Sequence, residues 1–202
     1  MAQKHIIPAY TIEPWNAEHD SSTFTSGIAQ IDKYIKEQAR RDVSSKLTMV
    51  FVLTEPGSKI IRAYYSLSAL GILFSDLPEN IQKKLPRYPQ ISATLLGRLG
   101  VDMNYSARVL KKTGQKPRFG ELLLINAQIN ALKGAKNIVG SALFVIDVLS
   151  PTAEEMKNGV GDPLSFYKQY GFLSFPGNER RLFKLTRTIE QEFAAASKTH
   201  EI

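Results

Sequence analysis

One stretch, residues 92–132, restricts the possible folds more than any other part of the chain. Its first part is apolar from Leu95 to Val101 and ends at Asp102, which is typical of a strand. Its last part carries apolar residues at helical spacing that would share one face: Leu122, Ile125, Ile129 and Leu132. Residues 103–114 are predicted to form a loop between the two. A strand that leads through a loop into a helix indicates a mixed α/β fold.

The segment between the predicted strand and helix is basic and contains no acidic residue. Its cations are Arg108, Lys111, Lys112, Lys116 and Arg118. The segment leads to Gly120 at the start of the helix, where free N–H groups and the helix dipole favour anions. A phosphate site is one interpretation, and an ordinary solvated loop is the other. Because neither GxxxxGK[ST] nor GxGxxG occurs, a nucleoside-triphosphatase and a Rossmann enzyme lack support.

Composition narrows the class of protein further. A chain of 202 residues fits one domain with a full-sized core, and its net charge of +7 suggests an anionic partner. The chain has no cysteine, and His5, His19 and His200 lie near its ends, so a serine–histidine hydrolase and a metal centre are disfavoured. No apolar run approaches the roughly 18 residues that span a bilayer, and no signal peptide is evident, so we expect a cytoplasmic protein.

The rest of the chain alternates short strands and helices. We expect strands at residues 8–15, 47–54, 60–70, 142–148, 172–175 and 181–185, and helices at 28–42, 163–170 and 189–197. Thr25-Ser26-Gly27 offers a side-chain cap for the first helix. Three prolines restrict residues 76–90 to a short helix and an exposed loop. The last helix is predicted to lie outside the core.

Five motifs follow one another along the chain. They are Phe24 to Ala39, Tyr64-Tyr65-Ser66-Leu67-Ser68, Pro86-Arg87-Tyr88-Pro89 with Leu95-Leu96-Gly97-Arg98-Leu99, Gln115 to Gly120, and Phe166-Tyr167 with Gly171-Phe172. Together they resemble the GCN5-related N-acetyltransferase (GNAT) superfamily, and within it the GNAT-type toxins of bacterial type II toxin–antitoxin modules. The acyl-CoA loop of that superfamily reads Q/R-x-x-G-x-G/A. Gln115 and Gly120 match it, whereas Arg118 stands where the middle glycine is usual, after a longer loop.

The resemblance implies a fold, an activity and partners. The fold would be a single-domain GNAT acyl-CoA N-acyltransferase fold over residues 1–187, a mixed sheet with splayed central strands, followed by a helical extension at 188–202. The activity would be the transfer of an acetyl group from acetyl-CoA, the co-substrate, to the α-amino group of aminoacyl-tRNA. This acetylation would block translation, and the reaction would need no metal. The partners would be charged tRNA, a ribbon–helix–helix antitoxin and a second copy of the chain.

The resemblance also assigns roles to individual residues. Tyr167 would protonate the departing coenzyme A thiolate, with Tyr170 a weaker candidate. The acyl-CoA contacts would be Leu99, Gly100, Val101, Gln115, Lys116, Arg118, Phe119 and Gly120, with Glu121 capping the helix. The acceptor end of tRNA would meet Arg98, which could equally form a structural ion pair. The tRNA backbone would meet Lys83, Lys84 and Arg87, residues 108–118, and Arg180, Arg181, Lys184 and Arg187.

Three other functions stay open on the sequence. The first is a GNAT enzyme that acetylates a small amine, a peptide N-terminus or a protein lysine. The second is a non-catalytic binding module that keeps the fold, which Arg118 and the long loop would favour. The third is a DNA-binding regulator, which rests on net charge alone. The sequence does not identify the acceptor amino acid, a general base or the oligomeric state.

Overall fold

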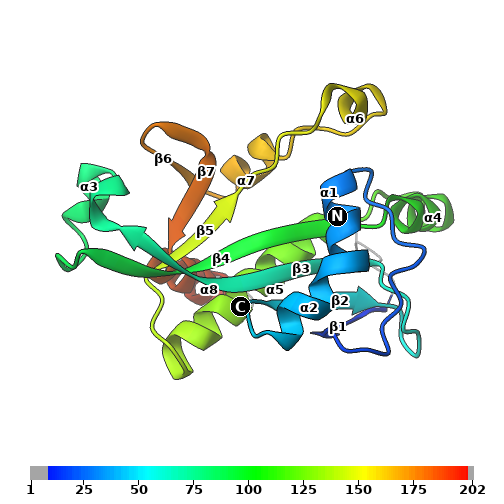
Figure 1. The fold of residues 1–202 in the computed structure, drawn as a ribbon, viewed down its shortest axis with the longest axis horizontal. Coiled ribbons are helices and arrows are strands. Elements are labelled where there is room, and N and C mark those ends of the chain that lie inside the picture. Colours follow the sequence, from blue (N-terminus) through cyan, green and yellow to red (C-terminus); the bar gives the residue numbers. More distant parts are fainter. Residues whose placement is uncertain (1–8, 200–202) are drawn as a thin grey trace. The chain divides into compact units, whose positions relative to one another are not determined.

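The computed structural model describes residues 9–199, and its strands form one seven-stranded sheet (Figure 1). The strands are β1 (Thr11–Pro14), β2 (Met49–Thr54), β3 (Ala63–Leu73), β4 (Gln90–Val101), β5 (Leu143–Asp147), β6 (Leu173–Phe175) and β7 (Asn178–Leu185), in the spatial order β1-β2-β3-β4-β5-β7-β6. Strands β4 and β5 pair in parallel, whereas β1 with β2, β5 with β7 and β6 with β7 pair antiparallel. The sheet is therefore mixed, and the predicted fold class is confirmed.

The helices connect these strands. They are α1 (Ala29–Lys33), a π-helical turn (Tyr34–Gln38), α2 (Ala39–Ser44), a 3₁₀ turn (Phe74–Asp76), α3 (Glu79–Gln82), α4 (Met103–Thr113), α5 (Phe119–Asn137), α6 (Ala153–Lys157), α7 (Leu164–Gln169) and α8 (Thr186–Thr199). Within residues 9–199, none of these helices has the length and apolar character needed to cross a membrane.

The chain divides into two compact units. Among the described residues, the first contains 9–66, 98–125 and 152–160, and the second contains 67–97, 126–151 and 161–199. Strands β3 and β4 and helix α5 contribute residues to both units. Each unit has its own buried side chains and is described separately below.

The core of the first unit forms where α1 and the π-helical turn pack on the strand residues of that unit. Phe24 and Tyr64 meet edge to face at 5.5 Å, and the Tyr64 hydroxyl donates to the carbonyl oxygen of Ile31 at 2.7 Å. A Cβ atom at Gly100 would lie 2.4 Å from Cγ2 of Ile31, so only glycine fits β4 at this crossing. The packing of α1 therefore requires a glycine at this point of β4.

The core of the second unit is built on β5 and β7. Leu143, Val145, Phe183 and Leu185 are buried together, and the rings of Phe175 and Phe183 meet at 4.8 Å. These apolar strand residues bury one face of the sheet, which supplies most of the stabilisation of such a layer. The predicted strand at 142–148 is confirmed as β5, between β4 and β7.

Several predicted elements need correction. Residues 103–114 are not a loop: Asp102 accepts hydrogen bonds from the N–H groups of Asn104 and Tyr105 and starts α4, which ends at Gly114 with φ +70°. Helix α1 begins after Ile28 without a side-chain cap, because the Ser26 hydroxyl donates to Asp32 instead. The last helix does not lie outside the core, since Ile189 is 1% exposed.

Candidate active site and RNA-binding surface

The predicted contacts for the acyl chain lie on the last part of β4. The β4–β5 ladder runs from Ala93 to Leu96, and β4 then continues to Val101. Leu99 and Val101 are half-buried, and Gly100 is buried under Ile31. The main chain of residues 99–101 forms the end of β4, and its contact with the acyl chain stays a prediction.

The predicted diphosphate site lies in the short loop between α4 and α5. The Thr113 hydroxyl lies 2.9 Å from the carbonyl oxygen of Val109 and 3.1 Å from that of Gln115, which fixes the start of the loop. At the other end, the buried Phe119 ring stacks on Tyr105 with ring centres 5.1 Å apart. These contacts therefore hold the loop at both of its ends.

The side chains of this loop compensate for its departure from the glycine-rich pattern. Pro117 has no N–H group, so one amide donor of an acyl-CoA loop is lost here. Lys116 and Arg118 are exposed, and Arg118 forms an ion pair with Glu121 in the first turn of α5. Lys116 and Arg118 lie just before α5, where cations and a helix N-terminus would favour an anion, so the phosphate site stays a prediction.

Arg108 is one of the cations of this region that were predicted to bind tRNA. It instead belongs to a charged cluster with Arg62 and Glu55. Its guanidinium donates to Glu55 at 2.7 Å, and Arg62 donates to the same carboxylate at 3.0 Å. Burial opposes ionisation of Glu55, but the hydrogen bonds from Arg108 and Arg62 outweigh it and lower the pKa of that carboxyl. Both guanidinium groups also lie over the Tyr105 ring.

Tyr167 lies on α7 in the second unit. Its side chain is 7% exposed, and its ring meets Phe166 and Phe172 edge to face at 5.1 and 6.3 Å. Burial raises the pKa of the phenol, so the side chain is protonated at neutral pH. A protonated phenol can donate its proton, although burial makes it a weaker acid than an exposed tyrosine, and the predicted role of Tyr167 stays a prediction.

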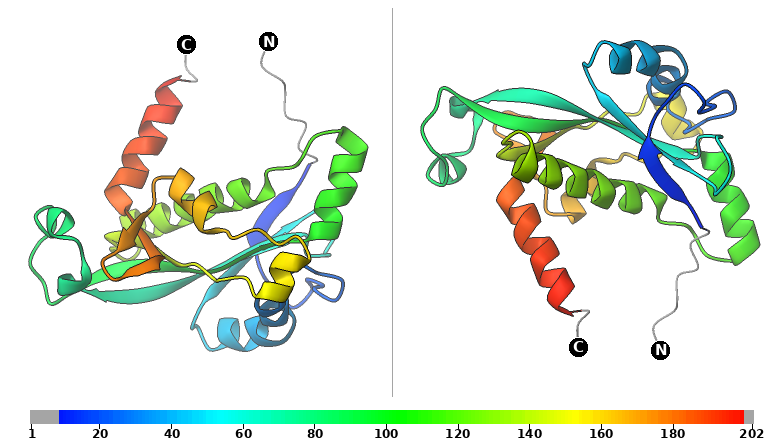
Figure 2. Two further views of the ribbon diagram at one scale, coloured as in Figure 1. Left: turned by 90° about the horizontal axis from the view of Figure 1, so that it is seen from above. Right: turned by 90° about the horizontal axis from the view of Figure 1, so that it is seen from below.

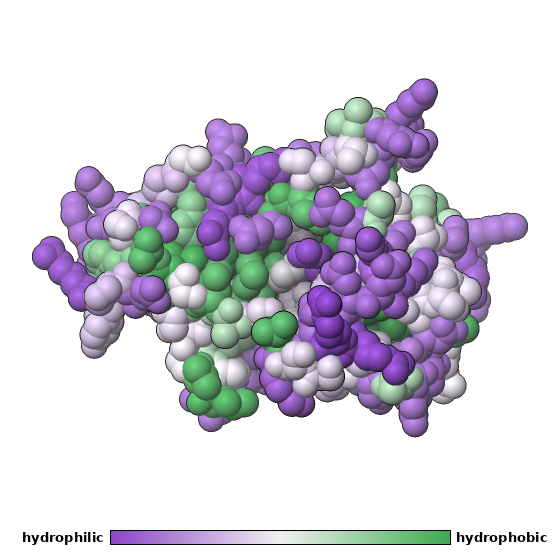
Figure 3. Space-filling view, viewed as in Figure 1, coloured by the Kyte–Doolittle hydropathy of each residue, from purple (hydrophilic) through white to green (hydrophobic). Residues whose placement is uncertain are grey.

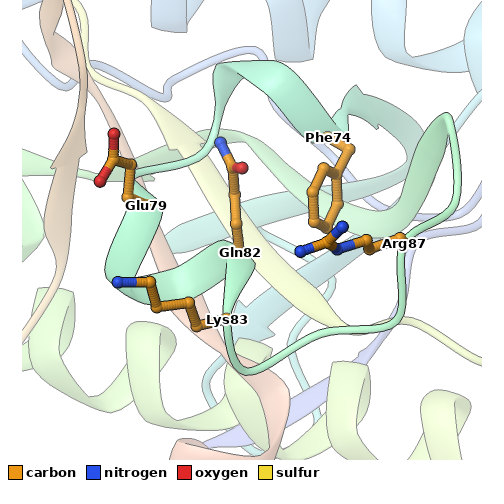
Figure 4. A pocket seen from close by; sticks show the side chains of 5 residues that line it. All are labelled: Phe74, Glu79, Gln82, Lys83 and Arg87. Atoms are coloured by element: carbon orange, nitrogen blue, oxygen red, sulfur yellow. The ribbon is translucent and has the colours of Figure 1, made fainter.

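The predicted tRNA contacts Lys83, Lys84 and Arg87 lie on a rigid arm between β3 and β4. The Phe74 N–H donates to the carbonyl oxygen of Pro89 at 3.1 Å and closes the arm, while Leu77 and Ile81 are buried within it. A pocket of about 450 Å³ opens on the arm (Figure 4), lined by Phe74, Glu79, Gln82, Lys83 and Arg87. The structure thus brings two of the three predicted cations to one pocket, whereas no motif in the sequence predicted Phe74 as part of its wall.

Arg98, the candidate for the acceptor end, lies on β4 in the first unit. Its guanidinium is 5.4 Å from the centre of the Tyr34 ring, and its side chain is half-buried. Burial raises the pKa of Tyr34, to which the Asp42 carboxylate also contributes. This cation–π contact fixes Arg98 and gives it a structural role, which is compatible with a further contact to substrate.

The predicted basic patch near the C-terminus needs correction. Arg180 donates twice to Asp162 at 2.9 Å and also to the carbonyl oxygens of Val148 and Leu149. Lys184 is 5% exposed, so it is not available to bind tRNA and that prediction is wrong for this residue. Arg180 thus links β7 to Asp162 and to the segment after β5, and Lys184 links β7 to Tyr170 and Glu192, all within the second unit. In the part of the chain that the structure describes, no group of His, Asp or Glu side chains has a metal-binding arrangement.

The chain is similar to known proteins over most of its length. No family model matches the chain. It is 27% identical to the probable toxin TacT of Sinorhizobium fredii over 179 residues. This match covers 88% of this chain and 92% of the relative. A structure of AtaT complexed with acetyl-methionyl-tRNAfMet superimposes with a TM-score of 0.73 at 25% identity, over 92% of this chain and 99% of AtaT.

A second AtaT structure has the same fold. It is a tyrosine-to-phenylalanine mutant toxin bound to the C-terminus of the antitoxin AtaR and acetyl-CoA, with a TM-score of 0.65 at 21% identity, over 92% of this chain and 99% of that one. The resemblance predicted from the motifs, to GNAT-type toxins, is confirmed by these matches, which extend over most of the chain.

Proposed function

We propose that this chain, a relative of GNAT-type toxins over about nine-tenths of its length, transfers an acetyl group from acetyl-CoA to the α-amino group of aminoacyl-tRNA and thereby blocks translation. The observation that carries the proposal is the match to AtaT in complex with acetyl-methionyl-tRNAfMet, which is the acetylated product on its tRNA. The acetyltransferase domain would comprise residues 1–187, and residues 188–202 a C-terminal extension. A cytoplasmic location is part of the proposal, because charged tRNA is found there.

The chemistry needs only side chains and backbone groups that the chain has. The neutral amine attacks the thioester carbonyl, a C–N bond forms and the C–S bond breaks. The thiolate takes one proton, and the nitrogen releases one proton to water, from which the proton donor is restored. The proposal assigns the proton that the thiolate takes to the Tyr167 hydroxyl, supported by its place in the motif Phe166-Tyr167 with Gly171-Phe172. Residues 99–101 would hold the acyl arm through the main chain. Gln115, Lys116, Arg118, Phe119 and Gly120 would hold the phosphates.

The arm between β3 and β4 would bind the tRNA backbone. Figure 4 shows the Arg87 guanidinium beside the Phe74 ring, with Lys83 on the neighbouring turn of the pocket wall. Cations that stand next to an aromatic face suit a phosphate and an adjoining base. Lys84, although it belongs to the same basic run, does not line the pocket. Arg98 would contact the acceptor end.

An antitoxin of the ribbon–helix–helix type and a homodimer complete the proposal. Figure 3 shows hydrophobic surface over the strands of the second unit, and exposed hydrophobic side chains of that unit include Leu73, Leu173, Ile138 and Val139. Exposed apolar patches of this kind mark protein–protein contacts. This surface supports an interface, either with a second copy or with the antitoxin.

The experiment that tests the function is an assay with radiolabelled acetyl-CoA and bulk tRNA, charged and uncharged, run beside the Tyr167→Phe variant. We expect label in charged tRNA only, and little label with the variant. Release of coenzyme A with small amines or peptides, but no label in tRNA, would show a different acetyltransferase. If acetyl-CoA neither binds nor turns over, the chain is not an acetyltransferase.

A further inference from the structure

A buried lysine joins the C-terminal helix to the helix of Tyr167. Lys184 lies on β7 between the buried residues Phe183 and Leu185 and is itself 5% exposed. A buried ammonium group is costly unless charges and hydrogen bonds compensate for its lost hydration. Lys184 therefore needs specific partners, and these show what it connects.

The partners of Lys184 come from two further elements. Its Nζ donates to Oε2 of Glu192 on α8 at 2.5 Å and to the carbonyl oxygen of Tyr170 at 2.7 Å. It also lies 5.6 Å from the centre of the Phe172 ring. Tyr170 is the residue that ends α7, so one ammonium group fixes the carboxyl end of α7 to β7 and to α8 at the same time.

The contacts continue to Tyr167. The Tyr170 N–H donates to the carbonyl oxygen of Tyr167 at 3.0 Å, and the Phe172 ring meets the Tyr167 ring edge to face at 6.3 Å. Helix α7 has only six residues and no side-chain N-cap, and a helix this short depends on tertiary contacts for its position. Lys184 therefore holds Tyr170 and Phe172 in place, and these two residues in turn contact Tyr167 from its C-terminal side.

We propose that Lys184 is a positioning residue: through Tyr170 and Phe172 it fixes the Tyr167 hydroxyl for proton transfer, and Glu192 makes α8 part of this support. The inference rests on the proposed role of Tyr167. It gives α8, which leaves the end of β7 as a separate helix (Figure 2), a function in turnover in addition to any role in binding a partner.

The same helix supplies a matched control. Glu190 pairs with Lys136 of α5 at 2.5 Å, and both side chains are about half exposed. Glu192 is exposed to a similar degree, at 51% of its side chain, but its lysine is buried and contacts α7. Glu190→Gln and Glu192→Gln thus each remove one ion pair of α8, and only Glu192→Gln removes a pair that leads to Tyr167.

The experiment measures kcat and KM for acetyl-CoA in Lys184→Met, Lys184→Arg, Glu192→Gln and Glu190→Gln, with the folded fraction determined by circular dichroism. We expect Lys184→Met to lower kcat about 10-fold or more, because displacing a reacting group by about 1 Å can cost up to 10²-fold. KM should stay within about twofold, since the substrate contacts are unchanged. Lys184→Arg should recover part of kcat, Glu192→Gln should lower it less than Lys184→Met, and Glu190→Gln should leave it unchanged.

The decisive comparison repeats Lys184→Met and Glu192→Gln in the Tyr167→Phe background. If Lys184 acts through Tyr167, neither substitution lowers the residual kcat further, because groups that act as a unit are not additive. An undiminished loss in that background, or a loss that only follows the folded fraction, would overturn the inference. If Lys184→Met does not fold, the kcat of Glu192→Gln is compared with that of Glu190→Gln instead. Equal kcat values in these two variants would overturn the inference. A Tyr167→Phe variant with normal turnover would instead refute the role of Tyr167 in the proposed function.

Discussion

The close contact at Gly100 gives the sharpest prediction about stability. A Cβ atom there would lie 2.4 Å from Cγ2 of Ile31 and 3.2 Å from both Cζ of Phe24 and Cε1 of Tyr64. All three neighbours are at most 4% exposed, so none can turn toward solvent. Gly100→Ala should therefore lower the free energy of unfolding by about 2–3 kcal/mol, at the upper end of the usual range for overpacking.

Gly134 provides the matched control. It lies within α5, and a Cβ atom added there would meet nothing within 4 Å. Gly134→Ala should therefore raise the free energy of unfolding by about 0.5–1 kcal/mol, because alanine favours the helix. Urea denaturation followed by circular dichroism measures both variants under the same conditions.

A double mutant tests the cause of the Gly100 effect. Ile31→Ala alone should cost about 2–5 kcal/mol, since it leaves a cavity, but it removes the atom that is 2.4 Å away. In that background Gly100→Ala should cost less than about 1 kcal/mol, so the two substitutions should show a coupling of about 1–3 kcal/mol. Equal costs in both backgrounds, or a Gly100→Ala variant as stable as Gly134→Ala, would refute the steric reasoning.

Three further predictions concern catalysis, RNA binding and pH. Tyr167→Phe should bind acetyl-CoA normally but lower turnover by about 10²-fold or more, the usual effect of losing a general acid, and isothermal titration together with the labelled assay would check both parts. Lys83→Glu with Arg87→Glu should weaken tRNA binding and reduce the slope of log Kd against log salt by about 1–2; an unchanged slope would exclude the arm as the RNA contact. Hydrogen bonds from Arg180 lower the pKa of Asp162 in the folded state, so this carboxylate stabilises the fold above its unfolded pKa of about 3.9 and the stabilisation disappears as pH falls through the folded value. In thermal melts, the melting temperature of Asp162→Asn should accordingly be lower than that of the wild type at pH 7 and equal to it near about pH 2. A difference in melting temperature that persists in acid would contradict the assignment.

Local signals in the sequence were sufficient to predict the order of the main elements and the resemblance to GNAT-type toxins. The apolar periods of the β4–α5 region and of β5 depend on residues a few positions apart, which a sequence displays directly. The same holds for the motif around Tyr167, whose placement on α7 was predicted. Helix α4 was missed although Asp102, Tyr105 and Gly114 could have indicated its start, buried face and end, because the run of cations was interpreted as a loop.

The tertiary structure alone decided what the charged residues do. Arg108 looked like a free cation until folding placed Glu55, 53 positions away, beside it. Lys184 looked like part of an RNA-binding patch, but β7 buries it against Tyr170 and Glu192. Local spacing fixes which face of a strand or helix is apolar, whereas the partner of an ion pair depends on which distant segments meet. For this reason the fold and the resemblance to GNAT-type toxins could be predicted from the sequence, while the division of its basic residues between structure and binding could not.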